Sequence, residues 1–162
     1  MSPETFIRNA LEPALKLLPA KMDSPAGRAM IVSICLQESR LKYRAQIGGP
    51  ARGYAQFERE GGVIGVLSHA LTRPHIRMVL AALDYSPDSD QSACYAAIEH
   101  NDILACAFAR LLLWTLPDAL PAQDDPGAGW SQYIKAWRPG KPHRGTWDTF
   151  YEQAWEIVSQ PL

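Results

Sequence analysis

Apolar residues recur along most of the chain with the three- and four-residue spacing of amphipathic helices. The first predicted helix begins at Ser2-Pro3-Glu4, a helix-start signal, and ends at Leu18-Pro19, with a kink near Pro13. The same start signal at Asp23-Ser24-Pro25 opens a second helix that runs to about Ser39. No stretch alternates apolar and polar residues over a useful length, so the pattern predicts no strand.

Glycine and proline breaks divide the rest of the chain into shorter helices, predicted at 63–71, 75–83, 92–99, 103–116, 130–137 and from Thr146 onward. The segment 103–116 is apolar nearly all round, which is typical of a buried central helix. The last helix repeats large apolar residues from Trp147 at helical spacing, Trp155 among them, and is expected to pack a whole face against the core. The pattern therefore predicts an all-α domain around one central buried helix.

The composition fits a single globular domain spanning residues 1–162. Apolar residues make up 47% and charged residues 20%, and the net charge is −1 without a long block of one sign, so we expect no nucleic-acid partner. The N-terminus lacks the apolar core of a signal peptide, and the most apolar run is shorter than the roughly 20 residues of a membrane span. We expect no membrane insertion, and delivery by another factor if the protein acts outside the cytoplasm.

The cysteines and histidines show no spacing typical of a metal or cofactor site. Cys35, Cys94 and Cys106 lie in apolar helical surroundings, and we expect reduced, buried thiols. The four histidines also lack metal-ligand spacing, and neither a phosphate-binding loop nor a nucleophile elbow occurs. Cys35 has no histidine near it in sequence to activate it as a nucleophile. The sequence predicts no metal and no cofactor.

Glu38 is the strongest candidate for a reactive group. Together with Ile31, Ile34 and Cys35 it follows the spacing i, i+3, i+4, i+7, which places all four residues on one helix face. A carboxylate on a core-facing stripe loses solvent, and desolvation favours its protonated form. Two interpretations stay open: Glu38 faces this partly buried side, or it lies in a frayed last turn and points to water.

A protonated carboxyl group beside aromatic and amide groups is suited to glycoside cleavage. The candidate sugar contacts are Tyr54, Gln56, Phe57, Tyr133 and Trp137. Core packing is the alternative for each ring; it prevails for Trp147 and Trp155, and the two interpretations are balanced for Tyr54 and Trp137. The basic residues between Arg40 and Arg52 either help to hold an anionic substrate or belong to a solvated loop.

Four segments between residues 25 and 140 resemble, in order, the lytic transglycosylases and goose-type lysozymes. Glu38-Ser39 is similar to the Glu-Ser pair of their catalytic motif. Gly53-Tyr54-Ala55-Gln56, which ends 18 residues after Glu38, is similar to their Gly-Leu-Met-Gln segment. Asn101-Asp102-Ile103 is similar to the segment before their central helix, and Ala136-Trp137-Arg138-Pro139-Gly140 falls where the family has Ala-Tyr-Asn-x-Gly.

This resemblance implies a lysozyme-like fold and cleavage of the β-1,4 bond between N-acetylmuramic acid and N-acetylglucosamine in peptidoglycan. Glu38 would protonate the glycosidic oxygen and then act as base while the muramic acid 6-hydroxyl closes a 1,6-anhydro ring. Ser39 would orient Glu38 or the substrate, and Gln56 with the backbone at Gly53 and Tyr54 would line subsites. The chain also resembles bacteriophage wall-degrading proteins, which implies action on the wall after release or as a virion-associated protein, with other virion proteins as further partners.

Departures from the family pattern leave alternatives open. Tyr54-Ala55 replaces Leu-Met, which changes the cleft wall. Trp137-Arg138 replaces Tyr-Asn, so the tyrosine hydroxyl that would contact the acid is missing there, and Tyr133, one turn earlier, is the candidate replacement. An inverting hydrolase of the same fold needs a second carboxylate, for which Glu58 and Glu60 are candidates unless both are simple surface residues. A non-catalytic wall-binding or virion structural module is the third hypothesis.

Overall fold

The computed structural model describes residues 1–161. Its N-terminal helical segment shows how proline shapes a helix. α1 (Pro3–Phe6), η1 (Ile7–Leu11) and α2 (Glu12–Lys16) follow one another without a break. η1 is a π-helical turn, in which the Glu12 N–H bonds to Ile7 O, five residues back. The Pro13 ring has no N–H and would clash with the preceding turn of an α-helix, and the wider π-turn gives it room. A π-turn therefore stands where the sequence predicts a kink.

The remaining elements are helical as well. In chain order they are η2 (Ala20–Met22), α3 (Pro25–Ser39), η3 (Arg59–Val63), α4 (Ile64–Ser68), α5 (Arg73–Ala82), α6 (Gln91–His100), α7 (Asp102–Trp114), α8 (Pro126–Trp137) and α9 (Arg144–Val158). Extended pairing within residues 1–161 is limited to isolated bridges, Ala45 with Arg52 and Arg52 with Phe57. The predicted all-α fold is confirmed.

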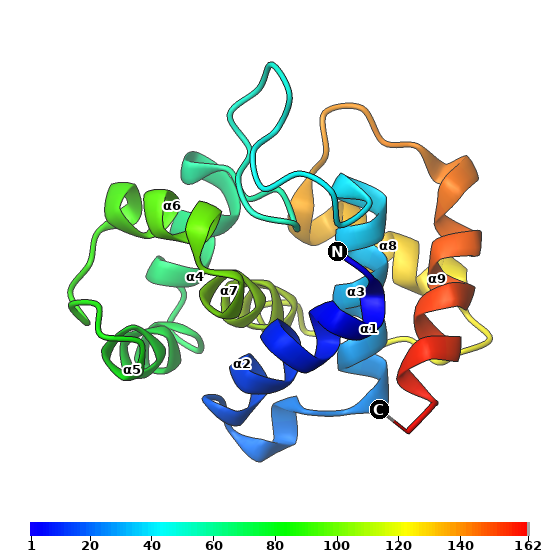
Figure 1. The fold of residues 1–162 in the computed structure, drawn as a ribbon, viewed down its shortest axis with the longest axis horizontal. Coiled ribbons are helices and arrows are strands. Elements are labelled where there is room, and N and C mark those ends of the chain that lie inside the picture. Colours follow the sequence, from blue (N-terminus) through cyan, green and yellow to red (C-terminus); the bar gives the residue numbers. More distant parts are fainter. Residues whose placement is uncertain (162) are drawn as a thin grey trace.

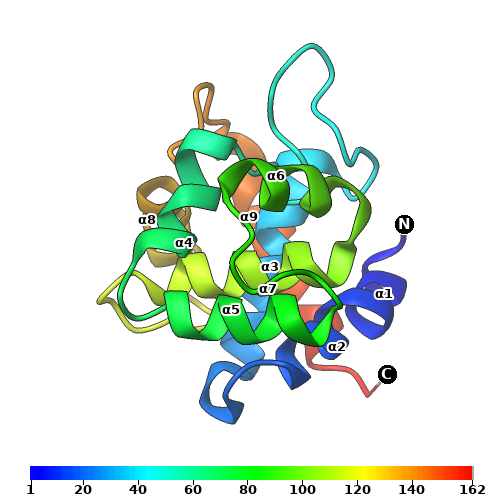
Figure 2. The same ribbon diagram turned by 90° about the vertical axis from the view of Figure 1, so that its left-hand side faces the viewer.

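α3 and α7 lie at the centre of the molecule (Figures 1 and 2). α7 packs against η1, α2, α3, α4, α5, α6 and α8, and every residue from Leu104 to Leu113 is buried. The Asn101 side chain caps its start by accepting a hydrogen bond from Leu104 N at 3.0 Å. α3 packs along α9. The apolar segment predicted at 103–116 is thus the buried central helix, although it ends at Trp114, before Pro117.

α8 and α9 begin earlier than the apolar pattern predicts. α8 begins at Pro126 rather than at residue 130, because the Asp125 carboxylate caps the first turn and proline suits the first helical position. α9 begins at Arg144, so Thr146 lies inside its first turn and is not its cap. The Thr146 hydroxyl instead donates to Gln37 Oε1 at 2.9 Å. This bond joins the start of α9 to α3, next to Glu38.

The aromatic stripe of α9 and the cysteines belong to the apolar core. Trp147 is fully buried and Trp155 is 9% exposed, as the helical spacing predicts. Cys35, Cys94 and Cys106 are free and buried. Burial raises the pKa of each thiol, that of Cys94 to about 11. The expectation of reduced, buried thiols is confirmed.

Candidate active site

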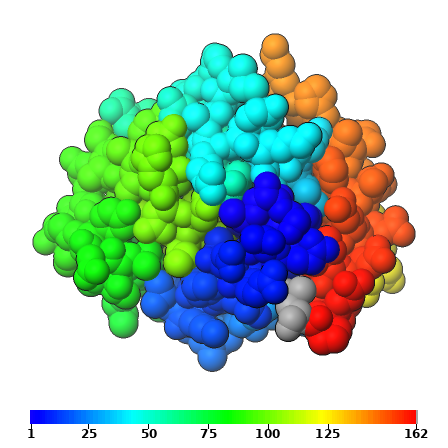
Figure 3. All heavy atoms as spheres, viewed as in Figure 1, coloured from blue at the N-terminus to red at the C-terminus, as the bar shows by residue number. Residues whose placement is uncertain are grey.

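A cleft of about 630 Å³ lies at the C-terminal end of α3. Loop 41–52 borders it on one side and residues 138–143, here called the rim loop, border it on the other. Figures 1 and 3 show these segments in cyan and orange at the same end of the molecule. α3, η3, α7 and α8 also contribute to the lining. The fold therefore brings together segments that are far apart in the sequence.

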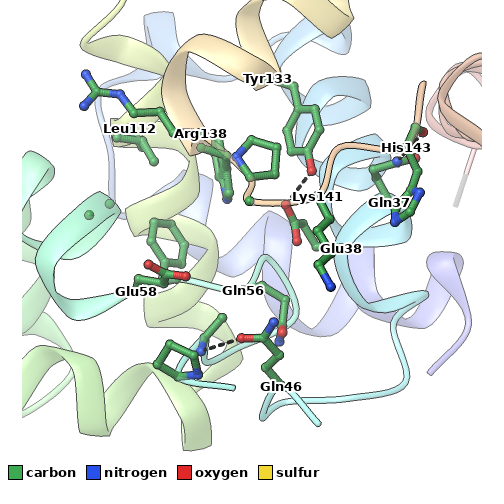
Figure 4. A pocket seen from close by; sticks show the side chains of 18 of the residues that line it. Gln37, Glu38, Gln46, Gln56, Glu58, Leu112, Tyr133, Arg138, Lys141 and His143 are labelled. Carbon is green, nitrogen blue, oxygen red and sulfur yellow. Dashed lines mark hydrogen bonds between the residues drawn. The ribbon is translucent and has the colours of Figure 1, made fainter. Parts of the chain in front are cut away.

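Glu38 lies in the last turn of α3, and its half-buried side chain lines the cleft (Figure 4). This turn ends in a defined cap, because Arg40 has a φ of 55° and its N–H bonds to Leu36 O at 3.0 Å. The pKa of Glu38 is raised, chiefly because burial disfavours the charged carboxylate. The hydrogen bond from Tyr133 lowers the pKa, and the nearby charge of Glu58 raises it. The carboxyl group is thus held at a cleft rather than in a frayed turn.

Tyr133, on α8, donates its hydroxyl to Glu38 Oε1 at 2.5 Å. Its ring is 2% exposed and stacks on Trp147, with centroids 5.1 Å apart and planes inclined by 6°. Trp147 is held in turn by a hydrogen bond from Nε1 to Pro126 O at 2.8 Å. Burial and the nearby Glu38 charge raise the pKa of Tyr133, so its hydroxyl stays protonated at neutral pH. The tyrosine contact that is missing at Trp137 is made from one turn earlier.

Ser39 connects the Glu38-Ser39 motif to the Gly53–Gln56 motif through hydrogen bonds to backbone atoms. Within residues 1–161 its Oγ bonds to backbone atoms alone, donating to Tyr54 O at 2.7 Å and accepting from Leu41 N at 3.2 Å. Gly53 is the first residue of the 53–56 turn, to which Tyr54 belongs. It has a φ of 76°, and a Cβ there would lie 2.9 Å from Ile98 Cγ2. A side chain would be strained at this position. Ser39 therefore positions the 53–56 turn and does not bond to the Glu38 carboxyl.

The side chain of Tyr54 is turned away from the cleft, contrary to the expectation that it contacts sugar. It is 4% exposed, and its ring meets Phe6 edge-on at 6.1 Å between centroids. The Arg44 guanidinium lies over the same ring at 4.6 Å. Burying this large ring in the core outweighs exposing it beside the cleft. Gly53 also lies outside the lining, so these two residues support the cleft wall from behind.

Gln56 and Trp137 do line the cleft. Gln56 has a φ of 55°, and its Nε2 donates to Gly53 O at 2.8 Å. Trp137 donates from Nε1 to Ala55 O at 2.8 Å, and its ring lies 5.8 Å from that of Phe57. This bond attaches the end of α8 to the 53–56 turn. Trp137 therefore holds α8 against the 53–56 turn, and its ring also lines the cleft.

The two further acids occupy different places. Glu58 is exposed and lines the cleft together with Glu38 (Figure 4). Glu60 lies outside the cleft lining, where it pairs with Arg59 at 3.0 Å and accepts from Gln91 Nε2 at 3.0 Å. Other lining residues that sequence reasoning missed are Gln37, Gln46, Arg138, Lys141 and His143. Apart from Gln37 these lie on irregular segments, whose course in space a periodic pattern does not give.

The arginines of loop 41–52 fasten this loop to the helices beneath it. Arg44 makes two bonds to the Asp102 carboxylate, at 3.0 and 2.8 Å. Arg52 lies over the Tyr95 ring at 5.5 Å, and the hydroxyl of that tyrosine donates to Pro50 O. These contacts favour a structural role for the two arginines over the binding of an anionic substrate.

No cluster of three or more His, Cys, Asp or Glu side chains suited to a metal ion occurs among residues 1–161. In the same part of the chain, no helix is long and apolar enough to cross a membrane. The chain matches no protein-family model, no curated protein and no solved structure. A functional proposal must therefore be supported by the geometry of the cleft and by the motifs in the sequence.

Proposed function

We propose that this protein is a lytic transglycosylase that cleaves peptidoglycan glycan strands, with Glu38 as both general acid and general base. The observation that carries the proposal is the state of Glu38. Its carboxyl group is half-buried at a cleft, has a raised pKa and receives a hydrogen bond from a rigidly held tyrosine. A general acid must be protonated near the working pH and must lie where a substrate can reach it.

In the first step the protonated Glu38 gives its proton to the glycosidic oxygen as the bond from C1 of muramic acid to that oxygen breaks. In the second step the muramic acid O6 attacks C1, and the Glu38 carboxylate accepts the 6-hydroxyl proton. A 1,6-anhydro ring forms, no water is consumed, and Glu38 is protonated again. The Tyr133 hydroxyl, 2.5 Å from Glu38 Oε1, stabilises the carboxylate that exists between the two steps.

The walls of the cleft supply groups suited to sugar rings. Gln46 and Gln56 present amide groups to the cleft, and Trp137 presents an indole ring. Amides pair with hydroxyl and acetamido groups, while aromatic rings pack against the apolar faces of sugars. The backbone bonds of Ser39 and Trp137 hold these walls in fixed positions relative to Glu38.

An inverting hydrolase is the second candidate, and the position of Glu58 favours it. Such an enzyme needs a second carboxylate about 6.5–9.5 Å from the acid, with room for a water between them. Glu58 is exposed and lines the same cleft as Glu38. Glu60 lies outside the cleft lining and is the less suitable partner.

Zymograms in peptidoglycan gels test the proposal, with mass spectrometry of the released fragments. We expect the wild-type protein to clear the gel and to leave 1,6-anhydro ends, and Glu38→Gln to lower the activity by about 100-fold or more. Glu58→Gln keeps most of the activity if the protein is a transglycosylase and loses it if the protein is a hydrolase, which leaves reducing ends. Glu60→Gln is the matched control.

Full activity of a folded Glu38→Gln variant would refute both enzymatic proposals. A wild-type protein that binds peptidoglycan without cleaving it would instead support a wall-binding or virion structural module.

A further inference from the structure

The rim loop is held at both ends. At its start, Arg138 has a φ of 49° and closes α8 through a bond from its N–H to Ile134 O at 3.0 Å. At its end, the His143 carbonyl accepts from Gln37 Nε2 at 2.9 Å. Gln37 directly precedes Glu38 on α3. The backbone of the rim loop is therefore held in a fixed position relative to Glu38.

Two cations on this loop line the cleft without a partner of their own. Arg138 and Lys141 are exposed, and within residues 1–161 neither side chain forms an ion pair or a hydrogen bond. Arg44 on the opposite loop differs, because it is paired with Asp102. Figure 4 shows Lys141 extending beside Glu38, while the Arg138 side chain extends past Leu112 in another direction. The rim loop thus offers two separate positive charges to whatever occupies the cleft.

The charge of the lining supports an anionic occupant. Its acids are Glu38 and Glu58, and its arginine and lysine are Arg138 and Lys141. When Glu38 is protonated, the lining carries one positive charge in excess, although the whole chain has a net charge of −1. A local charge opposite to that of the whole protein attracts ligands of the complementary sign.

We propose that the rim loop is a carboxylate subsite, in which Lys141 and Arg138 bind acidic groups that branch from the sugars of the bound glycan. The subsite rests on the proposed function, because it requires a glycan in the cleft. Muramic acid carries a lactyl ether whose carboxyl group is either free or joined to a peptide with carboxylates of its own. Both sources present the same group to the two cations, and a polymer of N-acetylglucosamine alone presents none.

Calorimetric binding to the Glu38→Gln protein, which keeps the ligand intact, tests this subsite. The probes are a neutral N-acetylglucosamine oligomer, a muramic acid-containing glycan with free lactyl carboxylates, and the same glycan with its peptides. Adding Lys141→Ala or Arg138→Asn should weaken binding of the carboxylate-bearing probes by about three- to tenfold each, with no change for the neutral oligomer. Asparagine is chosen because it tolerates the left-handed backbone at position 138.

Lys42→Ala is the matched control, since Lys42 is exposed and lies outside the cleft lining. Weakening confined to the glycan with free lactyl carboxylates assigns the carboxylate to the lactyl group, and weakening confined to the peptide-bearing glycan assigns it to the peptide. Weakening of both acidic probes shows that the two cations bind carboxylates from either source. Equal affinity for all probes in folded Lys141→Ala and Lys141→Glu proteins overturns the subsite while wall cleavage by the wild type still stands. Failure of the Glu38→Gln protein to bind any probe, with no wall cleavage by the wild type, overturns the proposed function as well.

Discussion

Replacing Tyr133 with phenylalanine removes one hydroxyl from the candidate active site and keeps the ring. That hydroxyl donates to Glu38 Oε1 at 2.5 Å, while the ring stacks on Trp147 and would remain there. A hydrogen bond to a carboxylate favours its charged form, so the loss of this bond raises the pKa of Glu38 further above its ordinary value.

A hydrogen bond to a charged group contributes about 1.5–3 kcal/mol, so its loss is large enough to be measured. The pKa of Glu38 should rise, and the alkaline limb of kcat/KM against pH should move upward with it. The developing carboxylate also loses its donor, so kcat should fall about tenfold, which corresponds to ~1.4 kcal/mol.

The assay is kcat/KM on soluble peptidoglycan fragments across the acid-to-alkaline range, with NMR titration of a ¹³C-labelled Glu38 carboxyl as a direct measure of its pKa. Tyr151→Phe is the matched control, because Tyr151 also contacts Trp147 but donates its hydroxyl to Ala122 O at 2.6 Å, away from Glu38. An alkaline limb that stays in place, or moves to lower pH, in folded Tyr133→Phe protein would show that the tyrosine does not tune the acid.

Three further variants probe the surroundings of the acid. Ser39→Ala removes the bonds that hold the 53–56 turn and should lower the free energy of unfolding by about 1–3 kcal/mol in urea titrations, without moving the pH profile. Gln37→Leu releases the His143 carbonyl, so amide exchange across 138–143 should accelerate and KM should rise more than kcat falls; unchanged exchange would contradict this. Glu38→Gln should raise Tm at neutral pH. The pKa of Glu38 in the folded state lies above its ordinary value of 4.5, so the wild type loses stability as pH rises from 4.5 through the folded-state pKa. Calorimetry should show that the Tm difference between the variant and the wild type vanishes below pH 4.5.

The helices and the position of Glu38 follow from local rules in the sequence. Proline, serine and aspartate mark the starts of α1 and α3, and the apolar run of α7 predicts a buried helix. The spacing of Glu38 with Ile31 and Cys35 predicts a partly buried carboxyl, because three- and four-residue intervals keep side chains on one helix face.

The partners of Glu38 do not follow from such rules. Tyr133 lies 95 residues further along the chain, and its contact depends on how α8 packs against α3 and α9. The burial of Tyr54 was equally hidden, since a ring beside a glycine can turn either way until Phe6 and Arg44 are placed around it. The rim loop has no periodic pattern, so the positions of Arg138 and Lys141 emerge with the tertiary structure alone.

The fastening of loop 41–52 at its base has a consequence for engineering. Bonds from Arg44 to Asp102 of α7 and from Tyr95 of α6 to Pro50 O hold the base of the loop, but the tip carries a 77% exposed Ile47. Residues can therefore be exchanged or inserted at the tip with little disturbance of the core. A longer tip would cover more of the cleft and leave Glu38 and Tyr133 in place, so this loop can be redesigned separately from the rest of the candidate site.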